Sequence, residues 1–386
     1  MIRNCKTCGG RIRYDIKSEG LVCESCESFY KVGDYSKVNT NDDMDCDIYA
    51  CSSCGAELII NNTESSTFCP FCGNATVVMN RVAKIKKPEV ILPFEVTAQE
   101  AAKNIKMMFN KGIFVPDVVH PEVDDMRGIY IPYHVTNVEF DGSKVYIAKG
   151  GKYNNTSYMA SGYCTANWVT TDASKKFNDT FSQRMEPFYF DKFKKFNEDY
   201  LLGFYSDIAD ELESDAIAKA RVRVMDMASE AFDNVLFSAE QYDSRRFYID
   251  TRFTTEVYSK PVTAMLPAWF YTYNYNGKPY TIAVNGQTGQ VSGSVPWSQK
   301  KFVIITTLLS ILFTAILFVP FLFMPKDLLT ILFISCFPVL GMVTILLNIV
   351  IAKLGGYKNF KDSMNLTNIA ASNSLTGFVN DRQEGQ

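Results

Sequence analysis

The chain has 386 residues, of which 47% are apolar and 21% are charged, and its formal net charge is −3 at pH 7. These values exclude a disordered tail and a basic nucleic-acid coat protein, and they allow a buried core. The chain has only two histidines, His120 and His134, and no phosphate-binding loop, Gly-x-Ser-x-Gly or His-Glu-x2-His motif. The common acid–base and nucleophilic enzyme classes therefore lack their residues here.

Eight cysteines near the N-terminus form two quartets of Cys-x2-Cys pairs, and the second quartet repeats the first 46 residues further on. Two such turns joined by a short hairpin can place four sulfurs about 2.3 Å from one zinc ion. Glycines after the turns, such as Gly9 and Gly55, suit a tight backbone. We therefore predict two small zinc ribbons, at residues 1–40 and 46–80, with one structural Zn²⁺ each. The predicted ligands are Cys5, Cys8, Cys23, Cys26, Cys51, Cys54, Cys69 and Cys72.

A disulfide framework or a redox-active dithiol is the alternative reading of these cysteines. No secretory signal peptide is recognised before Cys5, and a redox motif does not need four copies in register, so metal-binding thiols are favoured. Cys46 lies outside the quartets and is interpreted as a bystander, with replacement of a ligand as the alternative. Cys164 and Cys336 are interpreted as buried thiols.

The charge of the first 80 residues opposes contact with nucleic acid. This segment has seven Lys or Arg and 11 Asp or Glu, a net charge of −4 before any metal centre is counted. Phosphate binding needs a cationic surface, so an acidic segment is disfavoured as a nucleic-acid interface.

Residues 81–299 have the composition of an α+β domain. Thr97-Ala98-Gln99-Glu100 is a capping box and predicts a helix to about Asn110. A second helix is predicted from about Asp207 to Phe232, with a solvated charged face. Its predicted core stripe is Leu212, Ala216, Ala220, Val224 and Ala228.

One cluster in this part of the chain combines a histidine with carboxylates. His120, Asp124 and Asp125 flank Pro121 in a predicted loop. No third ligand or nucleophile is indicated, so the cluster is interpreted as polar loop sequence rather than as a catalytic or metal site.

Two segments 135 residues apart resemble each other. Residues 131–134 with Asp141-Gly142 match residues 266–269 with Asn276-Gly277. In each, a proline opens an alternating strand, and the Gly-containing pair is predicted to close a β-hairpin. We interpret them as two related hairpin units and a possible internal duplication, with chance similarity as the alternative.

The C-terminal part contains two uncharged runs, at residues 302–324 and 328–352. At 1.5 Å per residue each is longer than the roughly 30 Å apolar layer of a bilayer, which predicts a transmembrane helical hairpin over 302–352. Lysines on its outer flanks predict that both termini and the ribbons face the cytosol of a bacterial inner membrane. Residues 353–386 are predicted to be a flexible cytosolic tail.

In combination these features resemble a bacterial family of membrane-anchored double zinc-ribbon proteins, often labelled transcription-factor-IIB-type or primosomal/replisome-like. The further shared motifs are Leu92-Pro93-Phe94, Gly128–Tyr133, Tyr200–Phe204 and Val284–Gly289. The acidic linker at residues 41–46 departs from the family pattern. The resemblance implies membrane partners of the phage-shock and flotillin-like types.

The predicted fold class is therefore multi-domain, with tandem four-cysteine zinc ribbons, an α+β middle domain and a transmembrane hairpin. The favoured function is a non-enzymatic membrane-anchored scaffold that recruits a protein partner, with membrane stress as the implied context. A membrane-tethered nucleic-acid binder and an enzyme with an unrecognised site are the alternatives. No small-molecule substrate is indicated.

Overall fold

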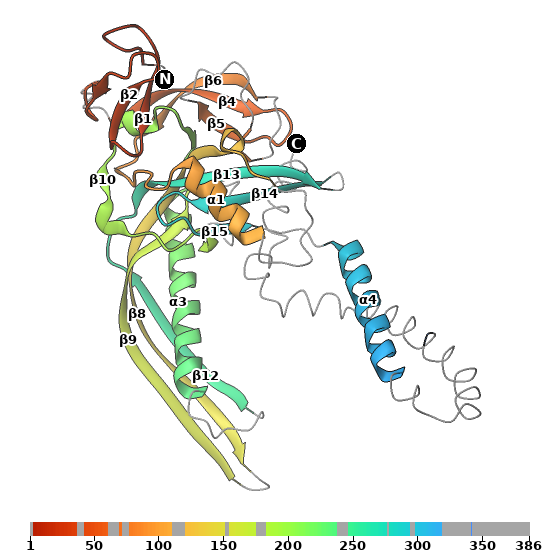
Figure 1. The fold of residues 1–386 in the computed structure, drawn as a ribbon. Helices are drawn as coiled ribbons and strands as arrows, with labels where there is room; N and C mark the ends of the chain where they lie inside the picture. The colour runs from red at the N-terminus through yellow and green to blue at the C-terminus, as the bar shows by residue number, and fades with distance from the viewer. Residues whose placement is uncertain are drawn as a thin grey trace, which may run out of the picture.

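The computed structural model describes residues 3–36, 42–60, 69–71, 77–109, 120–150, 154–174, 183–237, 246–275, 278–293, 298–318 and 341. These residues form a small three-stranded sheet, a mixed sheet of 12 strands and three α-helices (Figure 1). Short 3-10 helices occur at Val123–Asp125 (η1), Phe190–Lys192 (η2) and Glu198–Leu201 (η3).

The small sheet is the first ribbon. Its antiparallel strands are β1 (Ile12–Asp15), β2 (Gly20–Cys23) and β3 (Phe29–Tyr30). Ile12, Tyr14 and Leu21 are buried in one cluster with Leu201 and Leu202 of the body. The backbone N–H of Tyr14 also donates to the Leu202 carbonyl at 2.9 Å. The ribbon is therefore docked on the segment around η3 instead of standing free.

The large sheet contains the second ribbon and the middle of the chain together. Its main path runs in the order β10 (Lys194–Lys195), β7 (Val90–Ile91), β13 (Val262–Tyr275), β8 (Arg127–Gly150), β11 (Tyr205–Asp207), β5 (Glu57–Ile60), β4 (Asp43–Cys51) and β6 (Val77–Lys86). Off this path, β14 (Lys278–Asn285) pairs with β13 and with β15 (Val291–Gly293), while β9 (Asn154–Asp172) and β12 (Arg246–Val257) pair with β8.

This sheet corrects the predicted fold class. The second ribbon is not a separate small β-domain, because β6 crosses the expected boundary at residue 80 and β11 pairs with β5, Tyr205 opposite Ile60. The physical reason lies in the alternation of β4, which buries Met44, Cys46 and Ile48. A ribbon of some 35 residues is too small to cover such a face by itself, so the strand joins a larger core.

The predicted helix after the capping box is confirmed as α1 (Ala98–Phe109). The N–H of Glu100 donates to Thr97 Oγ1 at 3.3 Å, and the N–H of Thr97 donates to Glu100 Oε2 at 2.8 Å. Ala101, Ile105 and Met108 are buried, so the predicted face packs on the core.

The second predicted helix is α3 (Glu213–Phe237), which begins later than expected because Asp207 belongs to strand β11. Ala216, Ala220 and Val224 are buried as predicted, whereas Leu212 precedes the helix and is 60% exposed.

A long arm projects from the body (Figure 1). It consists of β9, β8 and β12 in that order, with α3 packed on one face through a cluster that includes Val138, Phe140 and Val224. The hairpin turn predicted at Asp141-Gly142 is wrong, since β8 continues through it to Gly150. Gly142 serves close packing instead: a Cβ there would lie 2.6 Å from the Phe140 ring and 2.7 Å from the Phe253 ring.

The second predicted hairpin is confirmed by the pairing of β13 with β14, in which Tyr275 is opposite Lys278. Its turn, Asn276-Gly277, lies outside the described residues. The two similar segments lie side by side, because β8 and β13 are antiparallel neighbours with Ile131 opposite Leu266.

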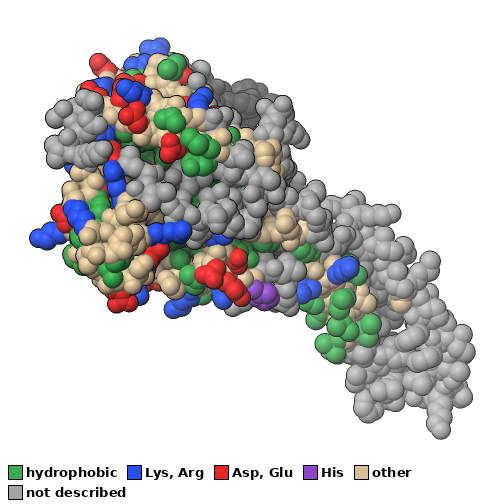
Figure 2. Space-filling model, turned by 90° about the horizontal axis from the view of Figure 1, so that it is seen from above, with side chains coloured by type: hydrophobic (Ala, Val, Ile, Leu, Met, Phe, Trp, Pro, Cys, Tyr) green, Lys and Arg blue, Asp and Glu red, His purple; other side chains and the backbone are tan. Residues whose placement is uncertain are grey.

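The predicted transmembrane hairpin is wrong. Helix α4 (Gln299–Phe318) begins close to the expected start, and residues 319–340, which follow it, lie outside the described residues. Among the residues described, no helix combines the length and apolar character needed to cross a membrane. Exposed apolar side chains gather on the surface of helix α4 (Figure 2). The second expected span lies outside the described residues apart from Gly341.

The predictions that depended on this hairpin are corrected with it. These are the inner-membrane location with both termini in the cytosol, and the membrane itself as a partner. The phage-shock-type and flotillin-like partners were expected only at that membrane, and they have no support without it.

Candidate metal centres

The same backbone turn recurs at the three Cys-x2-Cys pairs that lie wholly within the described residues. In each turn the N–H of the first cysteine donates to the carbonyl five residues on, and the N–H four residues on donates back to the cysteine carbonyl, at 2.7–3.0 Å. The turns begin at Cys5, Cys23 and Cys51. The residue four positions after each cysteine has a positive φ: Gly9 at 73°, Glu27 at 58° and Gly55 at 65°. Glycine adopts this conformation without strain, which explains two of the predicted glycines.

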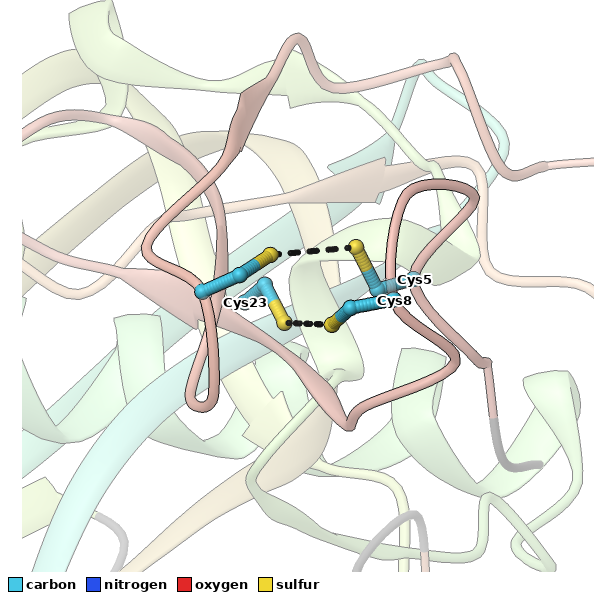
Figure 3. Close-up of side chains that lie close together, drawn as sticks. Cys5, Cys8 and Cys23 are labelled. Atoms are coloured by element: carbon cyan, nitrogen blue, oxygen red, sulfur yellow. Dashed lines mark hydrogen bonds between the residues drawn. The ribbon is translucent and has the colours of Figure 1, made fainter.

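These turns bring the first quartet together. The sulfurs of Cys5, Cys8, Cys23 and Cys26 all lie within 4.8 Å of one another. The Sγ atoms of Cys5 and Cys26 are 3.7 Å apart, and those of Cys8 and Cys23 are 3.5 Å apart (Figure 3). A zinc tetrathiolate with 2.3 Å bonds has sulfurs about 3.8 Å apart, whereas a disulfide needs about 2.05 Å. The donor set therefore fits zinc, and the disulfide reading is not supported.

Neighbouring donors stabilise the thiolate form of Cys5 and Cys26, whereas hydrogen bonds shared with Cys26 and Cys23 raise the pKa of Cys8 to about 12. The N–H groups of Thr7 and Gly10 point at Cys5 Sγ and Cys8 Sγ, each at 3.4 Å. The hydroxyl of Tyr30 lies 3.1 Å from Cys5 Sγ, and this hydrogen bond lowers the pKa of Cys5 to about 5. Hydrogen bonds from Ser28 likewise lower the pKa of Cys26. Because the thiolate is the metal-binding form, these groups favour metal binding at neutral pH.

The second quartet is built into the central sheet. Cys51, Cys54 and Cys69 are buried and their sulfurs lie within 4.8 Å of one another, while Cys72 lies outside the described residues. Phe71, in the same knuckle, is fully buried against Phe270 of β13, with ring centroids 5.5 Å apart. Its carbonyl accepts a hydrogen bond from Thr281 Oγ1 at 2.8 Å.

The two centres differ in exposure. In the first, Cys8 and Cys26 are exposed while Cys5 and Cys23 are buried, and in the second all three described cysteines are buried. A solvent-facing centre and an internal centre thus arise from the same spacing.

The other candidate residues lie apart from these centres. Cys46 is buried in β4 with Met44 and Ile59, and this burial raises the pKa of its thiol to about 12. The prediction that Cys164 is buried is wrong, because its side chain is exposed on β9. Cys336 is outside the described residues. His120 is exposed and joins no group of three potential metal ligands in the part of the chain that is described.

The charged face predicted for the second helix contains an ion-pair network that sequence reasoning missed. Arg223 Nη1 donates to Glu186 Oε1 at 2.8 Å and to the Thr170 carbonyl at 2.6 Å. Lys219 Nζ lies 2.8 Å from Glu211 and 3.4 Å from Asp172. The cations border an open cavity of about 310 Å³. Each cation faces carboxylates, so we interpret the network as a connection between α3 and the base of the arm. Glu186 and Asp172 are 37 and 47 residues from their cations, so these two pairings leave no local pattern in the sequence.

Comparison with known proteins agrees with this geometry. Residues 47–78 match a family model described as a zinc ribbon domain. The chain is also similar to "Uncharacterized protein YdjG" of Bacillus subtilis (strain 168), with 25% identity over 314 residues that cover 77% of this chain and 90% of that protein. No solved structure matches the chain significantly. The zinc-ribbon part of the predicted resemblance is thereby confirmed, and the two cysteine clusters are consistent with two zinc sites.

Proposed function

We propose that the chain is a non-enzymatic zinc-ribbon scaffold that binds a protein partner through its first ribbon. The observation that carries this proposal is the closed donor set of Cys5, Cys8, Cys23 and Cys26. Four protein thiolates fill a tetrahedral site, whereas catalytic zinc keeps a position open for water or substrate. The ions would act by holding the knuckles in shape.

The first ribbon has one face fixed and one face free. Its inner face is held on the body by the Tyr14–Leu202 hydrogen bond and by the N–H of Gly33, which donates to Asp199 Oδ2 at 2.7 Å. Its outer face exposes both knuckles and the ring of Phe29, which is 53% exposed. A rigid, partly apolar surface of this kind suits recognition of a protein.

The buried histidine gives the enzyme alternative little support. His134 is 3% exposed, and burial lowers its pKa. Its Nδ1 lies 3.4 Å from Thr263 Oγ1 and its Nε2 lies 3.5 Å from the Glu211 carbonyl. Its geometry is that of a buried core histidine.

The test is affinity capture from cell extract with the full-length chain, in wild-type form and as two matched variants. Phe29→Ala removes an exposed aromatic ring from the first ribbon, and Tyr189→Ala removes one of similar exposure, 57%, elsewhere. We expect a specific protein to be captured by wild type and Tyr189→Ala and to be lost with Phe29→Ala, at unchanged zinc content.

In parallel with the affinity capture, binding of the full-length chain to mixed DNA and RNA is measured at about 50 and 200 mM salt. Submicromolar binding that weakens steeply with salt would overturn the proposal, since phosphate contacts produce that slope. Equal capture by all three proteins would also contradict it, because the partner would then bind elsewhere.

A further inference from the structure

Strand β9 is a long free edge. It has 19 residues, and among the described strands it pairs only with β8. In Figure 1 it forms the outer border of the arm, away from β12, and it meets the body only at its end, where Trp168 stacks on Phe190 and Arg223 donates to the Thr170 carbonyl. The free N–H and C=O groups of an edge strand can pair with another strand.

The composition of β9 does not protect this edge. Residues 154–171 contain no charged side chain, whereas the opposite edge, β12, carries Arg246, Asp250, Arg252 and Glu256. Met159 and Tyr163 on β9 are 66% and 64% exposed, whereas Trp168, near the end of the strand, stacks on Phe190. Natural proteins guard long edges with charges, prolines or a covering element, so an uncharged edge of this length indicates that another strand covers it.

We infer that β9 is a dimer interface, at which a second copy of this chain adds its own β9 antiparallel to the first. The sheet then runs β12-β8-β9 in one protomer and β9-β8-β12 in the other. The midpoint of the strand, Tyr163, lies at the twofold axis, so each Tyr163 is opposite its counterpart. An isologous contact of this kind closes as a dimer and leaves no further edge of the same type.

The charge distribution favours a second copy over another occupant. The charged side chains of the arm strands lie on β8 and β12, with Glu139 and Asp141 on β8, and β9 carries only Asp172 at its end. In the pairing proposed, the two β8 strands are three strand spacings apart, about 14 Å, beyond the Debye length of about 8 Å at physiological salt. Two copies of β9 therefore meet without like charges opposite one another.

The test compares two substitutions that occupy matched places on the two edges. Tyr163 and Thr254 are both exposed, and both are cross-strand partners of Asp141, one on β9 and the other on β12. Tyr163→Lys places two lysines opposite each other at the twofold axis. Thr254→Lys adds the same charge to the other edge. Circular dichroism and zinc content establish that both variants are folded.

Sedimentation equilibrium of the full chain should show a dimer for wild type and for Thr254→Lys. For Tyr163→Lys the dimer dissociation constant should rise about fivefold or more, as expected for directly opposed like charges. Mixing Tyr163→Lys with Tyr163→Glu should restore a dimer, because opposite charges then face each other.

The exposed thiol of Cys164, next to the midpoint of β9, supplies a second measurement. A short bismaleimide should cross-link wild-type dimers, and Cys164→Ser should abolish the product. The inference is overturned by a wild-type chain that stays monomeric, by equal dissociation constants for the two lysine variants, or by a monomer whose β9 edge binds an unrelated peptide instead.

Discussion

Removing one ligand from each metal centre should have different structural consequences, and we develop this prediction first. Cys26→Ser removes an exposed ligand of the first centre, and Cys54→Ser removes a buried ligand of the second. Structural zinc contributes roughly 10–16 kcal/mol of apparent binding free energy, which matches or exceeds the entire stability of a typical domain. Each substitution should therefore remove one of two zinc ions. It should also unfold the part of the chain that this ion stabilises.

The effect of the first centre on the stability of the body is set by the contacts between the first ribbon and the body. These include the Tyr14–Leu202 backbone bond, the Gly33 N–H to Asp199, and the Arg3–Glu198 pair at 3.4 Å. A neutral hydrogen bond contributes about 1 kcal/mol and one to a charged acceptor about 1.5–3 kcal/mol. A partly exposed ion pair adds less than about 1 kcal/mol. Losing these contacts, and the burial of Ile12, Tyr14 and Leu21 against the body, should lower the stability of the body by several kcal/mol. Its 12-stranded sheet keeps its own strand pairing and should stay folded.

The second centre shares its core with the sheet. Phe71 is fully buried against Phe270, and burial of such a side chain contributes about 1.5–3 kcal/mol. Strands β4 and β5, on either side of Cys51 and Cys54, belong to the 12-stranded sheet itself. Cys54→Ser should therefore abolish the cooperative unfolding transition of the body, whereas Cys26→Ser should shift it modestly.

The assay combines elemental analysis, thermal unfolding and limited proteolysis of the full chain. For Cys26→Ser we expect one zinc ion per chain and cleavage confined to residues 3–36. For Cys54→Ser we expect general cleavage. Equal loss of stability in both variants, or two zinc ions retained in either, would refute the reasoning.

Three further predictions concern the fold. Gly142→Ala should destabilise the arm by about 1–3 kcal/mol in urea unfolding, because its Cβ would lie 2.6 Å from the Phe140 ring, while Ser143→Ala should be nearly neutral. Arg223→Met should lose about 3 kcal/mol by leaving Glu186 without its cation, and adding Glu186→Gln should recover part of that loss; no recovery would show that the pair is not coupled. Hydrogen bonds from the backbone and hydroxyl of Thr97 lower the pKa of Glu100, so the capping box stabilises α1 above the ordinary glutamate range and this contribution is lost as the pH falls. The stability difference between wild type and Glu100→Gln should accordingly be present at pH 7 and disappear in acid; a difference that persists at low pH would contradict this assignment.

The sequence predicted the features that depend on neighbours in the chain. The capping box at Thr97 and Glu100 operates over three residues, and each knuckle turn closes within six, so spacing was sufficient to predict both. The β13–β14 hairpin is similarly local.

The features that sequence reasoning missed depend on distant partners. Gly142 looked like a turn residue, but the Phe253 ring that takes the place of a Cβ comes from 111 residues further on. Asp207 looked like the start of a helix, yet it is opposite Leu58 in the sheet. The transmembrane prediction rested on uncharged runs alone, and among the described residues no helix is long and apolar enough to cross a membrane.

The two cysteine quartets show most clearly how context separates identical patterns. Their spacing is the same, and the turns at Cys5 and Cys51 have the same hydrogen bonds. The difference is in how they join the body: the first ribbon is a separate three-stranded sheet packed on the body, whereas the strands beside the second quartet belong to the 12-stranded sheet itself. A metal ion at the second centre therefore stabilises the sheet from which the arm extends, whereas a metal ion at the first stabilises a separate small sheet that is docked on the body. It follows that zinc loss at the first centre can alter recognition while the arm and its β9 edge persist, so partner binding and dimerisation should be separable by mutation.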